Sequence, residues 1–431
     1  MKQVILAHRD RALVSAEEVA RRAEMLAPYR SFLSTVAESE EYDFPESSIR
    51  LPFDAEIEET VKSLSSRFKT GKLSYVILIG SGGSALGAYA VYAARYSWAD
   101  TLTPRSPKLV VLDGLSSATL ATLFSVFDRA VRTPDEVLVF VSTKSGTTTE
   151  TLTTYEALFA YLHGRFGAHA GERFMFITDA ASPLMEQVRL RGISVRETAR
   201  LVGGRFSIFS LAHLLPLSAA GIDVFPLLEG ARAMRARCLD PDPEENPALA
   251  EAAMLHYHME RGARSQALFL FDAALAGVGS WYRQLLSESL GKEGKGLLPI
   301  IAVGPQDLHS MAQLFLGGPK DFFTTFVSVN DEPVIRLSRT EIAEHLGLGI
   351  SGKSVSEIGH AILAGVRDTY GERKLPFVDA VLPDVKERSV GQFLMWRMFM
   401  VMYLGKLLGV NAFDQPDVEV YKTETRGYLS R

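Results

Sequence analysis

The stretch YVILIGSGGSALG, residues 75–87, decides the fold class of this chain. Its first five residues are apolar, which predicts a buried strand, and the glycine- and serine-rich turn after them opens a helix. Glycines let backbone amides approach a ligand closely, and a helix N-terminus favours an anion. The stretch therefore predicts a βα unit of a parallel sheet, whose turn either binds a phosphate or a sugar or is an ordinary tight turn.

Similar apolar runs alternate with helix-length segments on both sides of this stretch. They lie at residues 75–79, 109–112, 137–141 and 174–177, and again at 267–271, 298–303 and 322–329. This alternation is typical of parallel α/β sheets, and 431 residues exceed one hydrophobic core. We expect a helical lead-in without strands (1–70), a first α/β domain (71–220), a second (221–390, mostly helical up to 264) and a C-terminal helical arm (391–431).

Composition narrows the class of protein. With 46 Lys and Arg against 51 Asp and Glu, the net charge is only -5, so the sequence predicts neither a nucleic-acid nor a membrane partner. Cys238 is the single cysteine, and the first residues are too polar for a signal peptide. Residues 393–410 are apolar but contain Arg397 and Lys406, which favours a buried helix over a membrane span. These features predict a cytoplasmic protein.

A second glycine-containing stretch, Ser142-Thr-Lys-Ser-Gly-Thr-Thr-Thr-Glu150, follows the run at 137–141. Its hydroxyls at the start of a helix offer many donors with little net charge, which suits a phosphate dianion. A helix cap needs only one hydroxyl, so phosphate binding is the favoured interpretation.

Two nucleotide-binding patterns also occur in the sequence. Gly80, Gly82 and Ala85 fit the dinucleotide form G-x-G-x-x-A, but the strand-ending acid, Asp113, lies further away than that fold requires. Residues 347–354, GLGISGKS, match the P-loop pattern, but the residues before them read as a short helix and not as a strand. There the glycines are predicted to end that helix, and Ser354 with Glu357 to form the capping box of the next.

Two segments supply candidate acid–base groups. Glu288 is predicted near the end of a helix that begins close to residue 279, where a carboxylate is poorly placed for stability. His309 follows the run at 298–303, and the end of a parallel strand is where such sheets carry ligands. His256 and His258 lie in a helical stretch without a third ligand, so we expect no metal site there.

Six segments in order resemble the glucose-6-phosphate isomerase family, in its shorter bacterial form. They are Gly80-Ser-Gly-Gly-Ser84, Lys144-Ser-Gly-Thr-Thr148, Gly203-Gly-Arg-Phe-Ser207, Glu288-Ser-Leu-Gly-Lys292, Asp307-Leu-His309, and Phe413-Asp-Gln-Pro416 followed by Tyr421-Lys422. The resemblance runs through most of the chain. It implies two sugar-isomerase (SIS) domains, each a doubly wound parallel sheet, and a C-terminal arm that embraces a second subunit.

The resemblance also implies roles for individual residues. Glu288 would be the base that moves a proton between C2 and C1, and Arg205 would steady the enediolate and keep water from the base. His309 and Lys422 would open the sugar ring, with His309 entering from the neighbouring subunit of a homodimer. The remaining site residues would hold the phosphate and nearby hydroxyls (Gly83, Ser84, Thr143, Lys144, Ser145 and Thr148) or line the site (Gly204, Gln284 and Gln415).

Two positions depart from the family pattern. Ser81 stands where the family usually has an apolar residue, and Thr143 replaces the common serine. Both side chains are small or can donate a hydrogen bond, so we expect activity to survive.

The implied reaction explains these residue types. Moving a proton between adjacent carbons through a cis-enediol needs one carboxylate and no cofactor, and a nearby cation stabilises the oxyanion. The remote phosphate supplies binding energy that positions the sugar. We expect interconversion of glucose 6-phosphate and fructose 6-phosphate. The alternatives are a dual isomerase that also accepts mannose 6-phosphate, a SIS-fold module that binds sugar phosphates without turnover, and a nucleotide-dependent enzyme.

Overall fold

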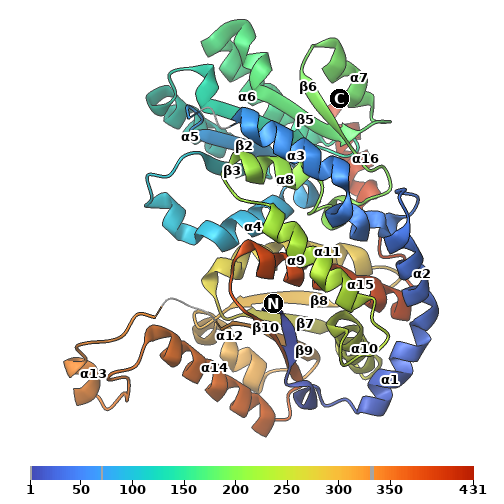
Figure 1. The fold of residues 1–431 in the computed structure, drawn as a ribbon, viewed down its shortest axis with the longest axis vertical. Helices are drawn as coiled ribbons and strands as arrows, with labels where there is room; N and C mark the ends of the chain where they lie inside the picture. Colours follow the sequence, from blue (N-terminus) through green and yellow to red (C-terminus); the bar gives the residue numbers. More distant parts are fainter. Residues whose placement is uncertain (1, 69–70, 331–333) are drawn as a thin grey trace.

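The chain forms two lobes, each built on a five-stranded sheet (Figure 1). The computed structural model describes residues 2–68, 71–330 and 334–431. The upper sheet is wholly parallel, in the order β3-β2-β4-β5-β6. Its strands are β2 (Tyr75–Ile79), β3 (Lys108–Leu112), β4 (Val137–Ser142), β5 (Phe174–Asp179) and β6 (Ser194–Thr198).

Alternate residues of the upper sheet enter two different cores. On β2, Val76 and Leu78 belong to the large core that continues into the lower lobe, whereas Ile77 and Ile79 belong to a separate core. Side chains of a strand point alternately to its two faces, so both faces are covered, as expected for a parallel sheet. The covering helices are α3 (Ala55–Phe68), α4 (Leu86–Tyr96) and α8 (Leu211–Ala219) on one face and α5 (Ser117–Ala130), α6 (Thr149–Phe166) and α7 (Pro183–Leu190) on the other.

The lower sheet has the order β1-β10-β9-β7-β8. Its strands are β7 (Ser265–Leu270), β8 (Leu298–Val303), β9 (Phe322–Val329), β10 (Phe377–Leu382) and β1 (Ile5–Ala7). One face packs against α10 (Pro247–Glu260), α11 (Ala276–Leu290) and α15 (Glu387–Leu408), and the other against α12 (Leu308–Gly317) and α14 (Val355–Glu372). The prediction of two doubly wound parallel-sheet domains is confirmed.

The expectation that residues 1–70 contain no strand is wrong. Besides α1 (Ala16–Met25), α2 (Ala27–Glu38) and α3, this segment contains β1, which pairs antiparallel with β10 at the edge of the lower sheet. In Figure 1 the blue N-terminal strand accordingly lies in the lower lobe, while α3 lies against the upper one. Residues 2–68 therefore connect the two lobes.

The predicted helix over residues 393–410 is α15, which is buried from Ser389 to Gly405. α9 (Phe225–Cys238), α10 and α11 pack around it. The predicted C-terminal arm, residues 391–431, therefore begins in the core, and its last helix, α16 (Val418–Leu429), has no buried residue. Arg397 is accommodated inside α15 because Glu251 on α10 meets its guanidinium with both carboxylate oxygens. Both side chains are fully buried, and a buried charge is tolerated only when it is paired in this way.

The P-loop-like stretch forms no nucleotide-binding turn. α13 (Glu341–His345) precedes it, and Gly347, Gly349 and Gly352 have positive φ angles beyond the helix end. Ser354 and Glu357 form the predicted capping box at the start of α14. Among the helices of the described residues, none is long and apolar enough to cross a membrane.

Candidate active site

A cleft of about 810 Å³ lies between the glycine- and hydroxyl-rich loops of the upper sheet, α11 and the C-terminal residues. Its walls include six residues predicted for the site: Ser145, Thr148, Gln284, Glu288, Gln415 and Lys422. β2 pairs with β3 on one side and with β4 on the other, so the chain order reverses between β2 and β4. The loops that follow these two strands both contribute to the cleft, at the kind of switch point where open α/β sheets bind ligands.

The hydroxyl-rich loop after β4 leads into the first turn of α6. Thr148 occupies the N-cap position, but its side chain makes no capping hydrogen bond. Its Oγ1 instead lies 3.1 Å from Thr143 Oγ1 and 3.4 Å from Ser145 Oγ. These hydroxyls are therefore gathered at a helix N-terminus without being used for capping, which leaves them suited to an anion.

The turn after β2 needs glycine because other chain segments press against it. A Cβ on Gly83 would lie 2.4 Å from the backbone nitrogen of Arg205 and 2.5 Å from the carbonyl carbon of Gly204. Gly82 has a φ of +53°, and a Cβ there would lie 2.8 Å from Gln284 Nε2. This turn is thus filled by protein backbone and a site glutamine. Ser84 lies beside it, outside the residues that line the cleft.

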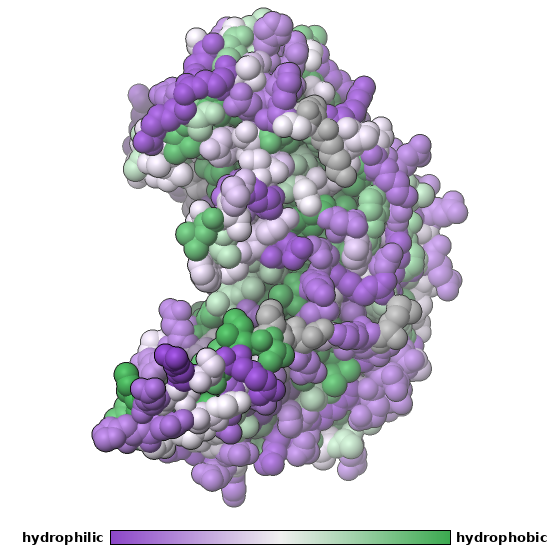
Figure 2. Space-filling model, turned by 60° about the vertical axis from the view of Figure 1, so that its left-hand side comes forward, coloured by the Kyte–Doolittle hydropathy of each residue, from purple (hydrophilic) through white to green (hydrophobic). Residues whose placement is uncertain are grey.

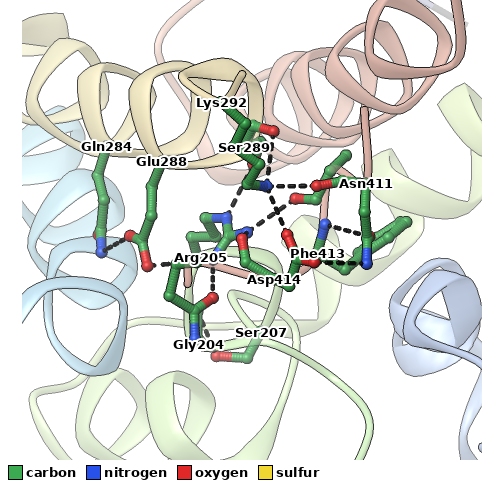
Figure 3. A network of polar contacts seen from close by, with 12 residues as sticks. Gly204, Arg205, Ser207, Gln284, Glu288, Ser289, Lys292, Asn411, Phe413 and Asp414 are labelled. Carbon is green, nitrogen blue, oxygen red and sulfur yellow. Dashed lines mark hydrogen bonds and ion pairs between the residues drawn. The ribbon is translucent and has the colours of Figure 1, made fainter. Parts of the chain in front are cut away.

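Glu288 lies on the last turn of α11, as predicted, and its carboxylate is held from two sides (Figure 3). Arg205 Nη1 donates to Glu288 Oε1 at 3.1 Å, and Gln284 Nε2 donates to Glu288 Oε2 at 2.8 Å. Gln284 comes from the same face of α11, one turn earlier. The Glu288 side chain is 24% exposed and lines the cleft, so it has access to a ligand.

Arg205 is only 2% exposed, and each of its five N–H groups meets an acceptor. Nε donates to Ser289 Oγ, Nη1 to Glu288 and Gln415, and Nη2 to the carbonyls of Ala412 and Asp414. Burial lowers the pKa of Arg205, while the carboxylates of Glu288 and Asp414 oppose that shift. A guanidinium keeps its charge in such surroundings, so the cleft has a fixed cation behind the carboxylate.

Two lysines predicted for the site have different surroundings. Burial lowers the pKa of Lys144, Asp179 opposes this and Arg205 adds to it, so Lys144 stands close to the fixed cation. Lys422 lines the cleft from α16, and its Nζ lies 2.7 Å from Glu419 Oε1.

His309 does not join these residues within one chain. It is the second residue of α12, exposed, and outside the residues that line the cleft. His309 does follow β8, as predicted, but β8 belongs to the lower sheet.

No role was predicted from the sequence for Lys292 and Asp414, which lie beside Arg205 in Figure 3; Lys292 also lines the cleft. Lys292 Nζ lies 3.0 Å from Asp414 Oδ1. Both residues stand inside segments that carry the family resemblance, and the signal was a lysine just after a helix-ending glycine. Arg283 and Arg426 also line the cleft.

His256 and His258, for which no metal site was expected, each contact other residues outside the cleft. Arg22 Nε lies 3.2 Å from His256 Nδ1, and His258 Nε2 lies 2.7 Å from the carbonyl of Ala12. Within the described part of the chain, no group of three or more His, Cys, Asp or Glu side chains is arranged to hold a metal ion.

The chain as a whole is similar to proteins of one family. A family model described as phosphoglucose isomerase matches residues 51–297. The chain is 33% identical to the glucose-6-phosphate isomerase of Symbiobacterium thermophilum, covering 88% of this chain and 85% of that protein. It is 31% identical to the glucose-6-phosphate isomerase of Rubrobacter xylanophilus, covering 100% and 99% of the two chains.

Among solved structures, a hypothetical protein of Thermus thermophilus is similar over 100% of both chains, with a TM-score of 0.88 and 28% identity. The part of the chain that matches the family model contains Arg205, Gln284 and Glu288. It also contains the two stretches predicted to bind phosphate, residues 80–87 and 142–150. The chain belongs to the phosphoglucose isomerase family.

Proposed function

We propose that this protein is a glucose-6-phosphate isomerase, which interconverts glucose 6-phosphate and fructose 6-phosphate. The observation that carries the proposal is the carboxylate of Glu288, held by Arg205 and Gln284 at the wall of the cleft. The relatives that are 33% and 31% identical to this chain carry this activity in their names. The reaction is an intramolecular proton transfer, for which one carboxylate is sufficient.

In the proposed mechanism the Glu288 carboxylate removes the proton from C2 of the open-chain aldose. The C2 electron pair forms the C1–C2 double bond of a cis-enediolate, and the resulting Glu288 carboxylic acid returns the proton to C1. A second proton moves from the oxygen on C2 to the oxygen on C1, so atoms and electrons balance. Arg205 lies 3.1 Å from the base and would stabilise the enediolate charge.

The phosphate is proposed to bind at the hydroxyl loop. Ser145, Thr148 and the neighbouring hydroxyl of Thr143 cluster at the N-terminus of α6, and Lys144 adds a positive charge. Four basic and four acidic side chains line the whole cleft (Arg283, Lys292, Lys422 and Arg426; Glu150, Glu288, Asp417 and Glu419). Because these charges balance, the hydrogen-bond donors of the loop would select the phosphate locally.

A coupled assay with purified protein tests the activity. Fructose 6-phosphate should be converted to glucose 6-phosphate, with turnover unchanged by a chelator and without added nucleotide. Mannose 6-phosphate is supplied in a parallel assay, and comparable turnover of both substrates would identify the dual isomerase. A folded protein that binds sugar phosphate without turning it over would be a binding module, and the proposed activity would be wrong.

The proposal includes a homodimer in the cytoplasm. His309 is exposed and outside the cleft of its own chain, which suits a residue that serves a partner. A projecting segment, residues 334–355, carries α13 away from the lower lobe (Figure 1), and hydrophobic side chains lie along this projection and the concave face beside it (Figure 2). Its exposed apolar residues are Val334, Ile335, Ile342, Leu346, Leu348 and Val355. Such a surface favours a protein partner, and the single, buried, free thiol of Cys238 suits a reducing compartment.

Mixing two inactive variants tests whether His309 is shared between subunits. Glu288→Gln and His309→Asn should each be nearly inactive as homodimers. After subunit exchange, about half of the dimers are hybrids, and each hybrid regains one site with both native residues. The mixture should therefore recover about a quarter of the wild-type activity. Mass-tagged subunits show whether exchange has occurred. If it has and the mixture is no more active than the separate variants, Glu288 and His309 belong to the site of one chain.

A further inference from the structure

Lys292 is a cation that the reaction does not use, although it stands only four residues after the proposed base. It follows the end of α11 and is 8% exposed. Its Nζ lies 3.0 Å from the Ser289 carbonyl and 3.0 Å from Asp414 Oδ1, and it also contacts the Asn411 carbonyl. An ammonium has three N–H donors, so these three acceptors satisfy it completely.

The acceptors of Lys292 and those of Arg205 lie on the same short segments. In the turn 411–415, Lys292 contacts Asn411 and Asp414, while Arg205 contacts Ala412, Asp414 and Gln415. Ser289 is shared as well, because its carbonyl accepts from Lys292 and its hydroxyl accepts from Arg205. Figure 3 shows contacts from both cations converging on this turn. A displacement of the turn would therefore move the acceptors of Arg205.

Charge gives Lys292 a second effect on Arg205. The Asp414 side chain is 51% exposed and its carboxylate is ion-paired with Lys292; the same carboxylate opposes the lowering of the Arg205 pKa. Burial lowers the pKa of Lys292, and the hydrogen bond and charge of Asp414 oppose this, so the ammonium depends on that carboxylate. Without Lys292, Asp414 would have Arg205 as its neighbouring cation and would compete with Glu288 for the guanidinium.

We propose that Lys292 is a positioning residue: by fixing the turn 411–415 and engaging Asp414, it holds the Arg205 guanidinium against Glu288. This inference rests on the proposed function, in which Arg205 stabilises the enediolate and keeps water from the base. Lys292 acts on the reaction only through Arg205. Its loss should therefore change the chemical step and the fate of the transferred proton more than the binding of substrate.

The test compares Lys292→Met, which keeps the length of the side chain without the charge, with Asp414→Asn. Lys295→Met is the matched control, because Lys295 lies three residues further on and its exposed side chain forms an ion pair with the likewise exposed Glu293 at 3.4 Å. Three quantities are measured: kcat and KM for fructose 6-phosphate, the deuterium incorporated per turnover in D₂O, and the thermal midpoint.

Lys292→Met should lower kcat by about 10- to 100-fold, with KM changed by less than about threefold, since misplacing a group by about 1 Å is sufficient for such a loss. Solvent deuterium per turnover should rise, because water reaches the base when Arg205 moves. Asp414→Asn should show the same pattern more weakly, and Lys295→Met should match the wild type. A loss of thermal stability alone would not alter the deuterium content of the product.

Two results would overturn the inference. One is a folded Lys292→Met variant with wild-type kcat and deuterium incorporation. The other is a crystal structure of that variant in which Arg205 Nη1 still lies at the wild-type distance from Glu288. If Lys292→Met does not fold, Asp414→Asn decides by the same criteria, since its carboxylate is half exposed. An inactive wild type would instead refute the proposed function, while the crystal structure would still judge the positioning.

Discussion

Replacing Glu288 with Gln is expected to lower kcat by about 10²- to 10⁴-fold, which corresponds to about 3–5 kcal/mol of transition-state stabilisation. The amide cannot accept the proton from C2, whereas its size matches that of the carboxylate. The Gln variant should also fold normally. Gln284 Oε1 is buried without a hydrogen-bond partner, so this side chain can turn and accept from the new amide. Arg205 can then keep its contact with the remaining oxygen.

Steady-state kinetics with fructose 6-phosphate, together with circular dichroism and the thermal midpoint, test this expectation. KM should change by less than about threefold, because the phosphate loop is untouched. Glu293→Gln makes the same chemical change at an exposed position just beyond α11 and should leave kcat unaltered. A folded Glu288→Gln variant with more than a tenth of the wild-type kcat would mean that another group is the base.

Replacing Arg205 with Lys is expected to lower kcat by about 10²- to 10³-fold, the range seen when one preorganised donor to a developing oxyanion is removed. The charge remains, but an ammonium has three donors where the guanidinium uses five. Acceptors among Ser289, Gln415 and the carbonyls of Ala412 and Asp414 would therefore lose a partner. The cation would also lie further from Glu288, because lysine cannot reproduce the planar fork.

The matched control for Arg205→Lys is Arg22→Lys. Arg22 is likewise buried and pairs with Glu18 and Glu260, and none of these three residues lines the cleft. Both substitutions should lower the thermal midpoint, because both leave buried acceptors unpaired. Only Arg205→Lys should lower kcat in the protein that remains folded. Equal effects of the two variants on kcat would show that Arg205 acts through stability alone.

The sequence predicted the elements that carry their signal locally. The strands at 75–79, 298–303 and 322–329 have the predicted bounds, because each is an apolar run with sharp ends. The capping box at Ser354 and the buried helix of residues 393–410 were also predicted from local sequence patterns. Three strands were not predicted: β1 has only three residues, β6 is largely polar, and β10 carries the charged Asp379 within its apolar run.

The two parallel sheets, the hydroxyl loop and the candidate carboxylate of Glu288 were predictable from the residues alone. Which of these meet depends on tertiary packing: Arg205 reaches Glu288 across 83 positions and Gln415 across 210, and β1 pairs with β10, late in the chain. The same packing placed His309 outside the cleft and joined Lys292 to Asp414. Hydrophobic periodicity fixes each element within a few residues, whereas contacts between distant elements depend on how whole helices and sheets pack, and no local pattern encodes that packing.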